Sequence, residues 1–210
     1  MKSKKNIAQG KDRLAGATDM RQRLLAAALG LFTQKGYAAT SVREIVETAH
    51  TTAPSLYYYF RSKEGLYLEL MQTQFRRLEA LYEQDGNEAL SFREQILLLC
   101  DAFLNQIVEE KDAFRLMMAI FYGPPQGAPF IDFESYRLRF YQRLFELIEK
   151  GIQAGELEPA DAGGMAWIII GVMRVAIEEY VIGMKEGIGL AGLRKILAMV
   201  LDRLMAGKPS

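Results

Sequence analysis

Apolar residues recur every three to four positions along almost the whole of this 210-residue chain, and this spacing constrains the fold more than any other feature. No window of four to eight residues alternates cleanly between apolar and polar side chains, as a half-buried strand does. Half of the residues are apolar, which is enough to build a buried core. The sequence therefore predicts an all-α protein of about nine helices.

Glycine, proline and capping residues divide this pattern into segments. Gly36 suits a left-handed helix end, and Ser41-Val-Arg-Glu44 has the spacing of a capping box. Thr52 is the expected N-cap of a short helix whose first turn tolerates Pro54. We predict helices at 18–36, 41–48, 53–60, 63–84, 90–110, 112–122, 130–154, 160–184 and 190–206.

The chain has no net charge, yet the charges are unevenly distributed. Residues 1–70 hold eleven basic and six acidic side chains, whereas the remainder holds fifteen basic and twenty acidic ones. This asymmetry indicates that the N-terminal part faces an anionic partner. We expect a disordered, lysine-rich tail at 1–17, a first domain at 18–62 and a second at 63–210, with the helix from 63 long enough to join both domains.

The two short helices predicted at 41–48 and 53–60 fit a helix-turn-helix, whose second helix enters the DNA major groove. In that second helix Ala53, Leu56 and Phe60 share one face, so we expect them to pack on the preceding helix, with Tyr59 at the margin. The residues left pointing outward are Thr52, Pro54, Ser55, Tyr57 and Tyr58.

Lys63 stands at the first position of the following helix, where a positive charge opposes the helix dipole. A DNA phosphate at this point would meet the ammonium group and the free amides of the helix start together. Tyrosine hydroxyls also donate hydrogen bonds to phosphate oxygens. We therefore predict that Lys63, Tyr57 and Tyr58 contact DNA.

Residues 18–71 resemble the DNA-binding domain of TetR-type (TetR/AcrR) bacterial transcriptional regulators, through LFTQKGYAATSVREIVETA, TTAPSLYYYF and RSKEGLYLEL. The remainder fits the family more loosely in its helix lengths and breaks. The resemblance implies a homodimer on an inverted-repeat operator in double-stranded DNA and a pocket for a small-molecule effector. It implies DNA contacts by Arg43, Thr52, Ala53, Pro54, Ser55, Tyr57, Tyr58 and Lys63.

The sequence departs from the family pattern at two places. His50 stands where glycine is usual, so it must adopt a positive φ or alter the turn. The segment 51–60 has no Lys or Arg, so any arginine–guanine contact must come from Arg43. Hydroxyl contacts, and apolar contacts of Ala53 and Pro54 with thymine methyl groups, would then carry more of the recognition.

The second domain is rich in aromatic and methionine side chains. Such residues are ordinary core material, but they also line adaptable pockets, and the resemblance places an effector pocket among these helices. A largely apolar or aromatic effector is the default expectation. The candidate pocket residues are Phe103, Ile107, Phe114, Met117, Met118, Phe121, Tyr122, Phe133, Tyr136, Phe140, Tyr141 and Trp167.

The last two predicted helices carry apolar stripes, and by resemblance this pair packs against its copy in a two-fold dimer. Arg174, Glu178 and Glu179 interrupt the first stripe, and an i,i+4 ion pair or an interface contact is a simpler explanation for them than a ligand contact. The candidate interface residues are Ile170, Ile177, Val181, Leu193, Leu197, Val200, Leu201 and Leu204.

Other classes of protein find little support. A single cysteine, Cys100, excludes an intramolecular disulfide framework, and the first residues lack the apolar segment of a signal peptide, so we expect a cytoplasmic protein. There is one histidine, no metal-ligand cluster, no nucleophile–base set and no glycine-rich phosphate loop. We expect no cofactor, no metal and no enzymatic activity.

The sequence thus predicts a dimeric, sequence-specific DNA-binding transcriptional regulator, most simply a repressor that a small molecule releases from DNA. The alternative is a protein of the same fold without an effector, acting constitutively or as an activator.

Overall fold

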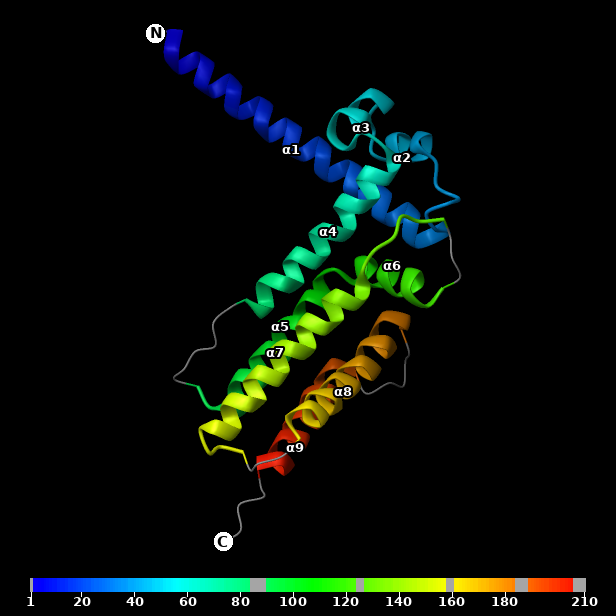
Figure 1. The fold of residues 1–210 in the computed structure, drawn as a ribbon. Coiled ribbons are helices and arrows are strands. Elements are labelled where there is room, and N and C mark those ends of the chain that lie inside the picture. Colours follow the sequence, from blue (N-terminus) through cyan, green and yellow to red (C-terminus); the bar gives the residue numbers. More distant parts are fainter. Residues whose placement is uncertain (1, 84–89, 124–126, 158–160, 184–188, 206–210) are drawn as a thin grey trace. The chain divides into compact units, whose positions relative to one another are not determined.

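A computed structural model describes the chain at residues 2–83, 90–123, 127–157, 161–183 and 189–205 (Figure 1). Within these ranges every regular element is a helix, which confirms the all-α prediction. The helices are α1 (Lys2–Lys35), α2 (Val42–Thr48), α3 (Ala53–Phe60), α4 (Lys63–Tyr82), α5 (Phe92–Glu109), α6 (Lys111–Tyr122), α7 (Phe133–Gln153), α8 (Ala162–Ile182) and α9 (Gly189–Met205).

The start of α1 differs from the expectation. We predicted a disordered tail at 1–17 and a helix beginning near residue 18, whereas α1 begins at Lys2. Lysine, glutamine, alanine and leucine all favour helix, so the helix continues through this segment without the apolar period that marks a buried face. At its other end α1 stops where expected, because Gly36 takes a φ of 82°.

The chain forms two compact units that interleave in sequence. Unit 1 comprises Met1–Gln74 and Arg115–Ile131, and unit 2 comprises Phe75–Phe114 and Asp132–Ser210. The helices α4 and α6 therefore each contribute residues to both units. The predicted boundary after residue 62 falls inside unit 1, which keeps the first twelve residues of α4.

Unit 1 is built around a small core between α1, α2, α3 and the start of α4. The inward faces follow the helical period, and α1 contacts both α2 and α3. Arg21 on α1 adds an ion pair to Glu69 on α4 at 2.6 Å, and its guanidinium lies 5.5 Å from the Phe60 ring. Core residues include Leu24, Ala28, Phe32, Ile45, Val46, Leu56, Phe60, Leu66 and Tyr67.

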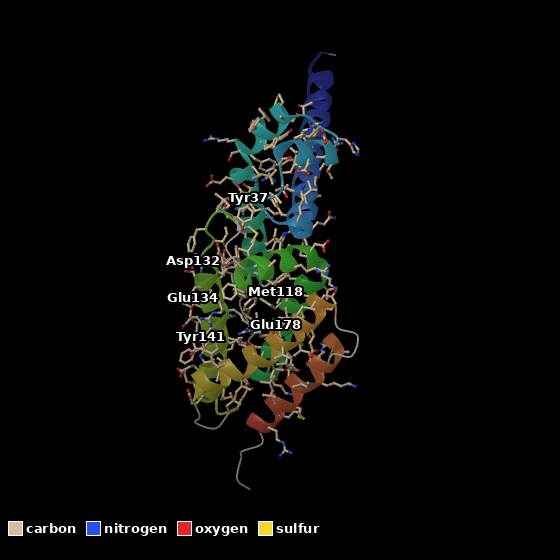
Figure 2. The ribbon with its side chains drawn as sticks, turned by 90° about the vertical axis from the view of Figure 1, so that its right-hand side faces the viewer. Tyr37, Met118, Asp132, Glu134, Tyr141 and Glu178 are labelled. Carbon is tan, nitrogen blue, oxygen red and sulfur yellow. The ribbon has the colours of Figure 1, made fainter. Side chains whose placement is uncertain are left out.

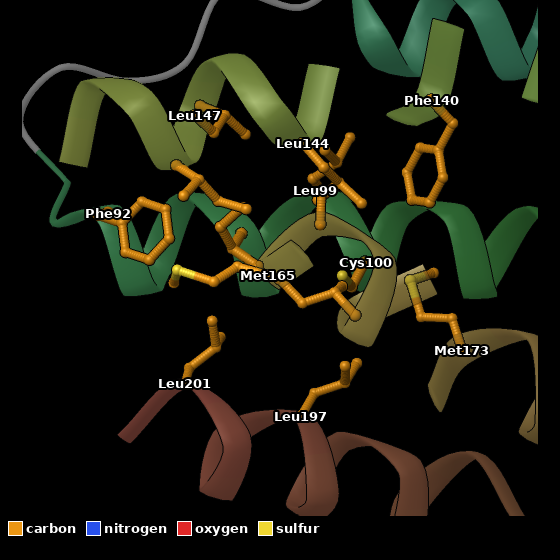
Figure 3. Packing of buried hydrophobic residues seen from close by; sticks show 14 of the residues in the cluster. Phe92, Leu99, Cys100, Phe140, Leu144, Leu147, Met165, Met173, Leu197 and Leu201 are labelled. Atoms are coloured by element: carbon orange, nitrogen blue, oxygen red, sulfur yellow. The ribbon is translucent and has the colours of Figure 1, made fainter. Parts of the chain in front are cut away.

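Unit 2 has the larger core, to which α5, α7, α8 and α9 all contribute (Figure 3). α8 lies beside both α7 and α9, and α5 packs against α7 and α9 (Figure 1). A close approach of α5 to α7 needs Gly151, since a Cβ there would lie 2.7 Å from the Phe92 ring. Cys100 is enclosed in this core, and burial raises the pKa of its thiol to about 12.

Crossing a lipid bilayer requires a helix that is both long and apolar along its length. None of the described helices combines these two properties.

Candidate nucleic-acid interface

The helix α2 is held at its start by the predicted capping box. The Ser41 amide donates to the Glu44 carboxylate at 2.9 Å, and the Ser41 hydroxyl accepts from the Glu44 amide at 3.3 Å. Lys35 on α1 donates to the same carboxylate, and these hydrogen bonds lower the pKa of Glu44 to about 2. The cap therefore also ties α2 to α1.

The turn between α2 and α3 uses a histidine where glycine is usual. His50 has a φ of 50°, so of the two alternatives left open by the sequence it adopts the positive φ. The Ala49 amide closes the last helical turn on the Ile45 carbonyl at 2.9 Å, and the reversed backbone at His50 lets the Thr51 amide donate to the Val46 carbonyl at 2.9 Å. These bonds satisfy carbonyls at the end of α2 and direct the chain into α3.

The helix α3 separates its aromatic run between two environments. Leu56 is fully buried and Phe60 nearly so, as the spacing predicted. Tyr57 and Tyr58 are 49% and 82% exposed, so their hydroxyls reach solvent. Tyr59 is half-buried at the margin, with its ring 5.0 Å from that of Tyr58. A buried side thus anchors a helix whose other side presents two phenol groups.

The start of α3 places small polar and apolar groups on the same open side. Thr52 is the N-cap as predicted, but its side chain makes no capping bond, and its hydroxyl instead lies 3.1 Å from the Ser55 hydroxyl. Pro54 is exposed, whereas Ala53 and Ser55 are half-buried. The two hydroxyls bond only each other in the described chain, so both keep hydrogen-bonding capacity for another group.

Lys63 has different surroundings from those predicted. Its ammonium donates to the backbone carbonyls of Tyr37 at 3.0 Å and Thr40 at 2.8 Å, and it lies 4.1 Å from the centre of the Tyr37 ring. Tyr37 is labelled in Figure 2. Burial lowers the pKa of Lys63. We expected a DNA phosphate to compensate this charge, but two carbonyls of the α1–α2 connection supply much of the compensation. One N–H of the ammonium is left for a further acceptor.

The turn from α3 to α4 is tight. Arg61 takes a φ of 63°, and a Cβ on Gly65 would lie 2.1 Å from the Phe60 carbonyl oxygen. The Ser62 hydroxyl accepts from the Gly65 amide at 2.9 Å, so Ser62 caps α4. Glycine at position 65 is therefore needed for the angle between α3 and α4.

Arg43 is an exposed cation on α2. Its side chain is 85% exposed, and its Nε donates to Glu47 Oε1 at 2.7 Å. This carboxylate raises the pKa of Arg43 further. Glu47 was not among the predicted site residues, although its i,i+4 spacing from Arg43 was a visible signal.

The residues predicted to line a pocket are distributed over both units. In unit 2 Phe103 and Phe140 pack against Tyr82 and against each other, with their own centroids 4.9 Å apart, and Phe114 meets the Phe103 ring edge-on at 6.2 Å. The remaining predicted residues lie in four other environments: Phe133 and Tyr136 pack against Phe75, Tyr141 packs against Trp167, Met117, Met118, Phe121 and Tyr122 belong to unit 1, and Ile107 is buried in α5.

An open groove of about 530 Å³ lies between α5 and α9, and it includes none of the predicted pocket residues. Its lining residues are Leu97, Asp101, Leu104, Asn105, Ala191, Arg194, Lys195 and Ala198. No group of three metal-ligating side chains occurs among the described residues.

The predicted dimer residues need a correction. Val181, Leu193, Leu197 and Leu201 are at most 3% exposed in the single chain, so they are core residues and are not available to a second copy. Their stripe faces inward because α9 packs on α5 and α8. Ile170, Ile177 and Val200 are half-buried, and the side chain of Leu204 lies outside the described residues. The exposed apolar residues of α8 and α9 are instead Trp167, Ile168, Val175, Ile182 and Met199.

Comparison with known proteins identifies the family. Residues 24–70 match the family described as bacterial regulatory proteins, tetR family. The transcriptional regulator AcrR of Shigella flexneri is 30% identical over 154 residues, which cover 69% of each chain. The chain belongs to the TetR/AcrR family of transcriptional regulators. Family membership places it among transcription factors rather than enzymes.

Other relatives of this TetR-family chain match over shorter stretches. YdgC, an uncharacterised regulator of Bacillus subtilis, is 33% identical over 102 residues, 47% of this chain and 52% of YdgC. The repressor NemR of Escherichia coli is 31% identical over 96 residues, 43% of this chain and 46% of NemR. The match thus spans about half the length of these two relatives.

Solved structures share the fold over a longer stretch. A TetR-like regulator from Rhodococcus sp. RHA1 superposes with a TM-score of 0.68 and 23% identity, covering 90% of this chain and 97% of its own. At that identity the likeness shows the fold alone.

Proposed function

We propose that this chain is a cytoplasmic, dimeric repressor that binds an inverted-repeat operator through α2 and α3 and is released by a small, largely apolar or aromatic effector. The observation that carries the proposal is the division of α3: Leu56 and Phe60 anchor it, while Tyr57 and Tyr58 are exposed. A folded chain gains no stability from presenting two phenols to water, but a phosphate or base edge accepts hydrogen bonds from both.

The proposed contacts fall into two groups. Tyr57, Tyr58 and the remaining N–H of Lys63 would bind phosphates, which sets the register of the protein on the duplex. Arg43 would read a guanine, and the first turn of α3 would meet other base edges. The base-reading residues of that turn are Thr52, Ala53, Pro54 and Ser55.

The dimer part of the proposal rests on the exposed face of α8 and α9. Trp167, Ile168, Val175 and Ile182 recur along α8 at helical spacing, and each is at least 45% exposed. A contiguous apolar face of this kind marks a protein contact more often than a solvated surface. We therefore place the two-fold interface on these residues of α8, together with the exposed Met199 of α9, rather than on the buried leucines of α9.

The effector part rests on the aromatic cluster of unit 2. Tyr82, Phe103 and Phe140 pack on one another and Phe114 packs on Phe103, with the contacting ring centroids 4.9–6.4 Å apart. Tyr82 lies on α4, the same helix that follows the reader α3 in the chain. A ligand that binds between these rings only when the protein is in the state that does not bind DNA would shift the equilibrium towards that state. The relative NemR is named as a repressor, and we propose repression for this chain as well.

A footprint on the DNA that flanks the gene tests the DNA-binding part of the proposal. The purified protein should protect an inverted repeat, and Tyr57→Ala should weaken protection by about tenfold, since a hydrogen bond to a charged phosphate is lost. Phe130→Ala, which removes an 86% exposed aromatic ring outside the reader helices, is the control and should leave the footprint unchanged. Equal protection by wild type and Tyr57→Ala would reject the assigned face.

A further inference from the structure

Arg43 and Glu47 form a pair on the exposed side of α2, opposite the buried Ile45. The two side chains are 85% and 59% exposed. An ion pair this open, one turn apart on a helix, contributes little to folding stability because water and salt screen it. The main effect of this ion pair is therefore to orient the Arg43 guanidinium rather than to stabilise the fold.

The pair leaves the guanidinium poised for a second partner. Glu47 Oε1 accepts from Nε at 2.7 Å, and no other hydrogen bond to Arg43 occurs in the described part of the chain. The Nη1 and Nη2 groups, which form the fork that matches guanine O6 and N7, remain available. A carboxylate on Nε restricts rotation of the long arginine side chain without blocking that fork.

The orientation of Arg43 is important because the DNA-binding helices α2 and α3 contain few basic residues. Arg43 is the sole Lys or Arg between residues 42 and 60, so α3 itself offers no arginine–guanine contact. A mobile arginine would bind any nearby phosphate, whereas a held one is directed to a base edge. The charge of Glu47 also opposes approach to phosphates generally, which penalises DNA that does not offer the right base.

We propose that Glu47 is a positioning residue that holds Arg43 for bidentate recognition of one guanine in each half-site and so sets operator specificity. This inference rests on the proposed DNA-binding function. It assigns discrimination between sequences to a residue that touches no base itself.

The experiment compares two substitutions that separate orientation from charge. Glu47→Gln keeps an acceptor oxygen for Arg43 Nε and removes the charge, whereas Glu47→Ala removes both. Glu134→Ala on α7 is the matched control, because Glu134 also pairs with an arginine (Arg137) and its side chain is 57% exposed (Figure 2). Each full-length variant is titrated against the duplex that wild type selects from random DNA, and against random duplex.

The decisive readout is sensitivity to a single acceptor atom. Each guanine of the selected half-site is replaced in turn by 7-deazaguanine, which lacks N7. Wild type should lose about tenfold in affinity at one guanine. Glu47→Gln should keep most of that loss, while Glu47→Ala should show less than about threefold and a correspondingly smaller ratio of selected to random affinity. Unchanged melting temperatures would show that all variants fold.

Three outcomes would overturn the proposal. In one, Glu47→Ala keeps the tenfold sensitivity. In another, Glu47→Ala and Glu47→Gln increase the affinity for the selected and the random duplex by the same factor. That result would mean that Glu47 acts only by charge repulsion, an effect that Glu134→Ala should also show, more weakly. In the third, wild type selects a duplex but is sensitive at no guanine. Failure of the DNA-binding function itself is distinct, because then wild type selects no duplex at all.

Discussion

The reader helix α3 and the last helix α9 use their apolar residues in opposite ways. α3 has four aromatic residues in succession, yet it buries only part of them and exposes Tyr57 and Tyr58. α9 carries the stripe Leu193, Leu197 and Leu201, and all three are within 1% of complete burial. The number of apolar residues in a helix therefore does not tell how many of them are buried. A helix packed on one side exposes the apolar residues of its other side, whereas a helix packed between neighbours exposes few of them.

The largest expected effect separates core from interface on α9. Leu197→Ala should lower the free energy of unfolding by about 2–5 kcal/mol, because it opens a cavity in the core of unit 2. Met199→Ala, at a 58% exposed position on the same helix, should cost less than about 1 kcal/mol and should instead weaken the dimer. Chemical unfolding at two protein concentrations measures both effects. A small decrease in the free energy of unfolding for Leu197→Ala would indicate that the α9 leucines belong to the dimer interface after all.

A second prediction contrasts a buried tyrosine with the exposed ones of α3. Tyr67 is fully buried, its hydroxyl has no partner among the described residues, and burial raises its pKa from 10.0 to about 12. Below pH 10 both folded and unfolded forms keep the proton. Above pH 10 the unfolded form loses it first, so about 2–3 kcal/mol of stability should disappear as the pH rises to 12.

The matched variants for that titration are Tyr67→Phe and Tyr58→Phe. Tyr67→Phe should lose less stability than wild type between pH 10 and 12, and Tyr58→Phe should follow wild type because Tyr58 is 82% exposed. Urea unfolding at each pH supplies the comparison. Parallel curves for wild type and Tyr67→Phe would contradict the assignment.

A third prediction tests the turn that sets the angle of α3. Gly65→Ala should destabilise unit 1 by about 1–3 kcal/mol, since its Cβ collides with the Phe60 carbonyl, and operator affinity should fall with it. Gly30→Ala is the control: no neighbouring atom lies within 4 Å of the place that its new methyl group would take, so the helix α1 should gain up to about 1 kcal/mol. Thermal unfolding distinguishes the two signs.

The smallest effect is expected for the capping box, a motif that occurs in both units. Ser41 and Ser91 each form a capping box, with Glu44 and Glu94 respectively. Replacing either serine by alanine should cost about 1 kcal/mol. Only Ser41→Ala should also weaken operator binding, because only α2 carries Arg43. Equal loss of DNA affinity in both variants would mean that the caps act through global stability rather than through placement of α2.

The sequence by itself determined the features that depend on neighbours within a few residues. The helical class, the capping box at Ser41, the positive φ of His50 and the inward side of α3 all follow from local spacing and backbone sterics. The family resemblance at residues 18–71 came from the same local pattern.

Only the tertiary structure decided where side chains meet partners far along the chain. Lys63 donates to carbonyls 26 and 23 residues away, so no local rule could separate that bond from a phosphate contact. The α9 leucines have the period of either a core or an interface, and burial by α5 and α8 made them core. The physical reason is common to both cases: a helix period identifies a face, but which surface covers it depends on how distant segments pack.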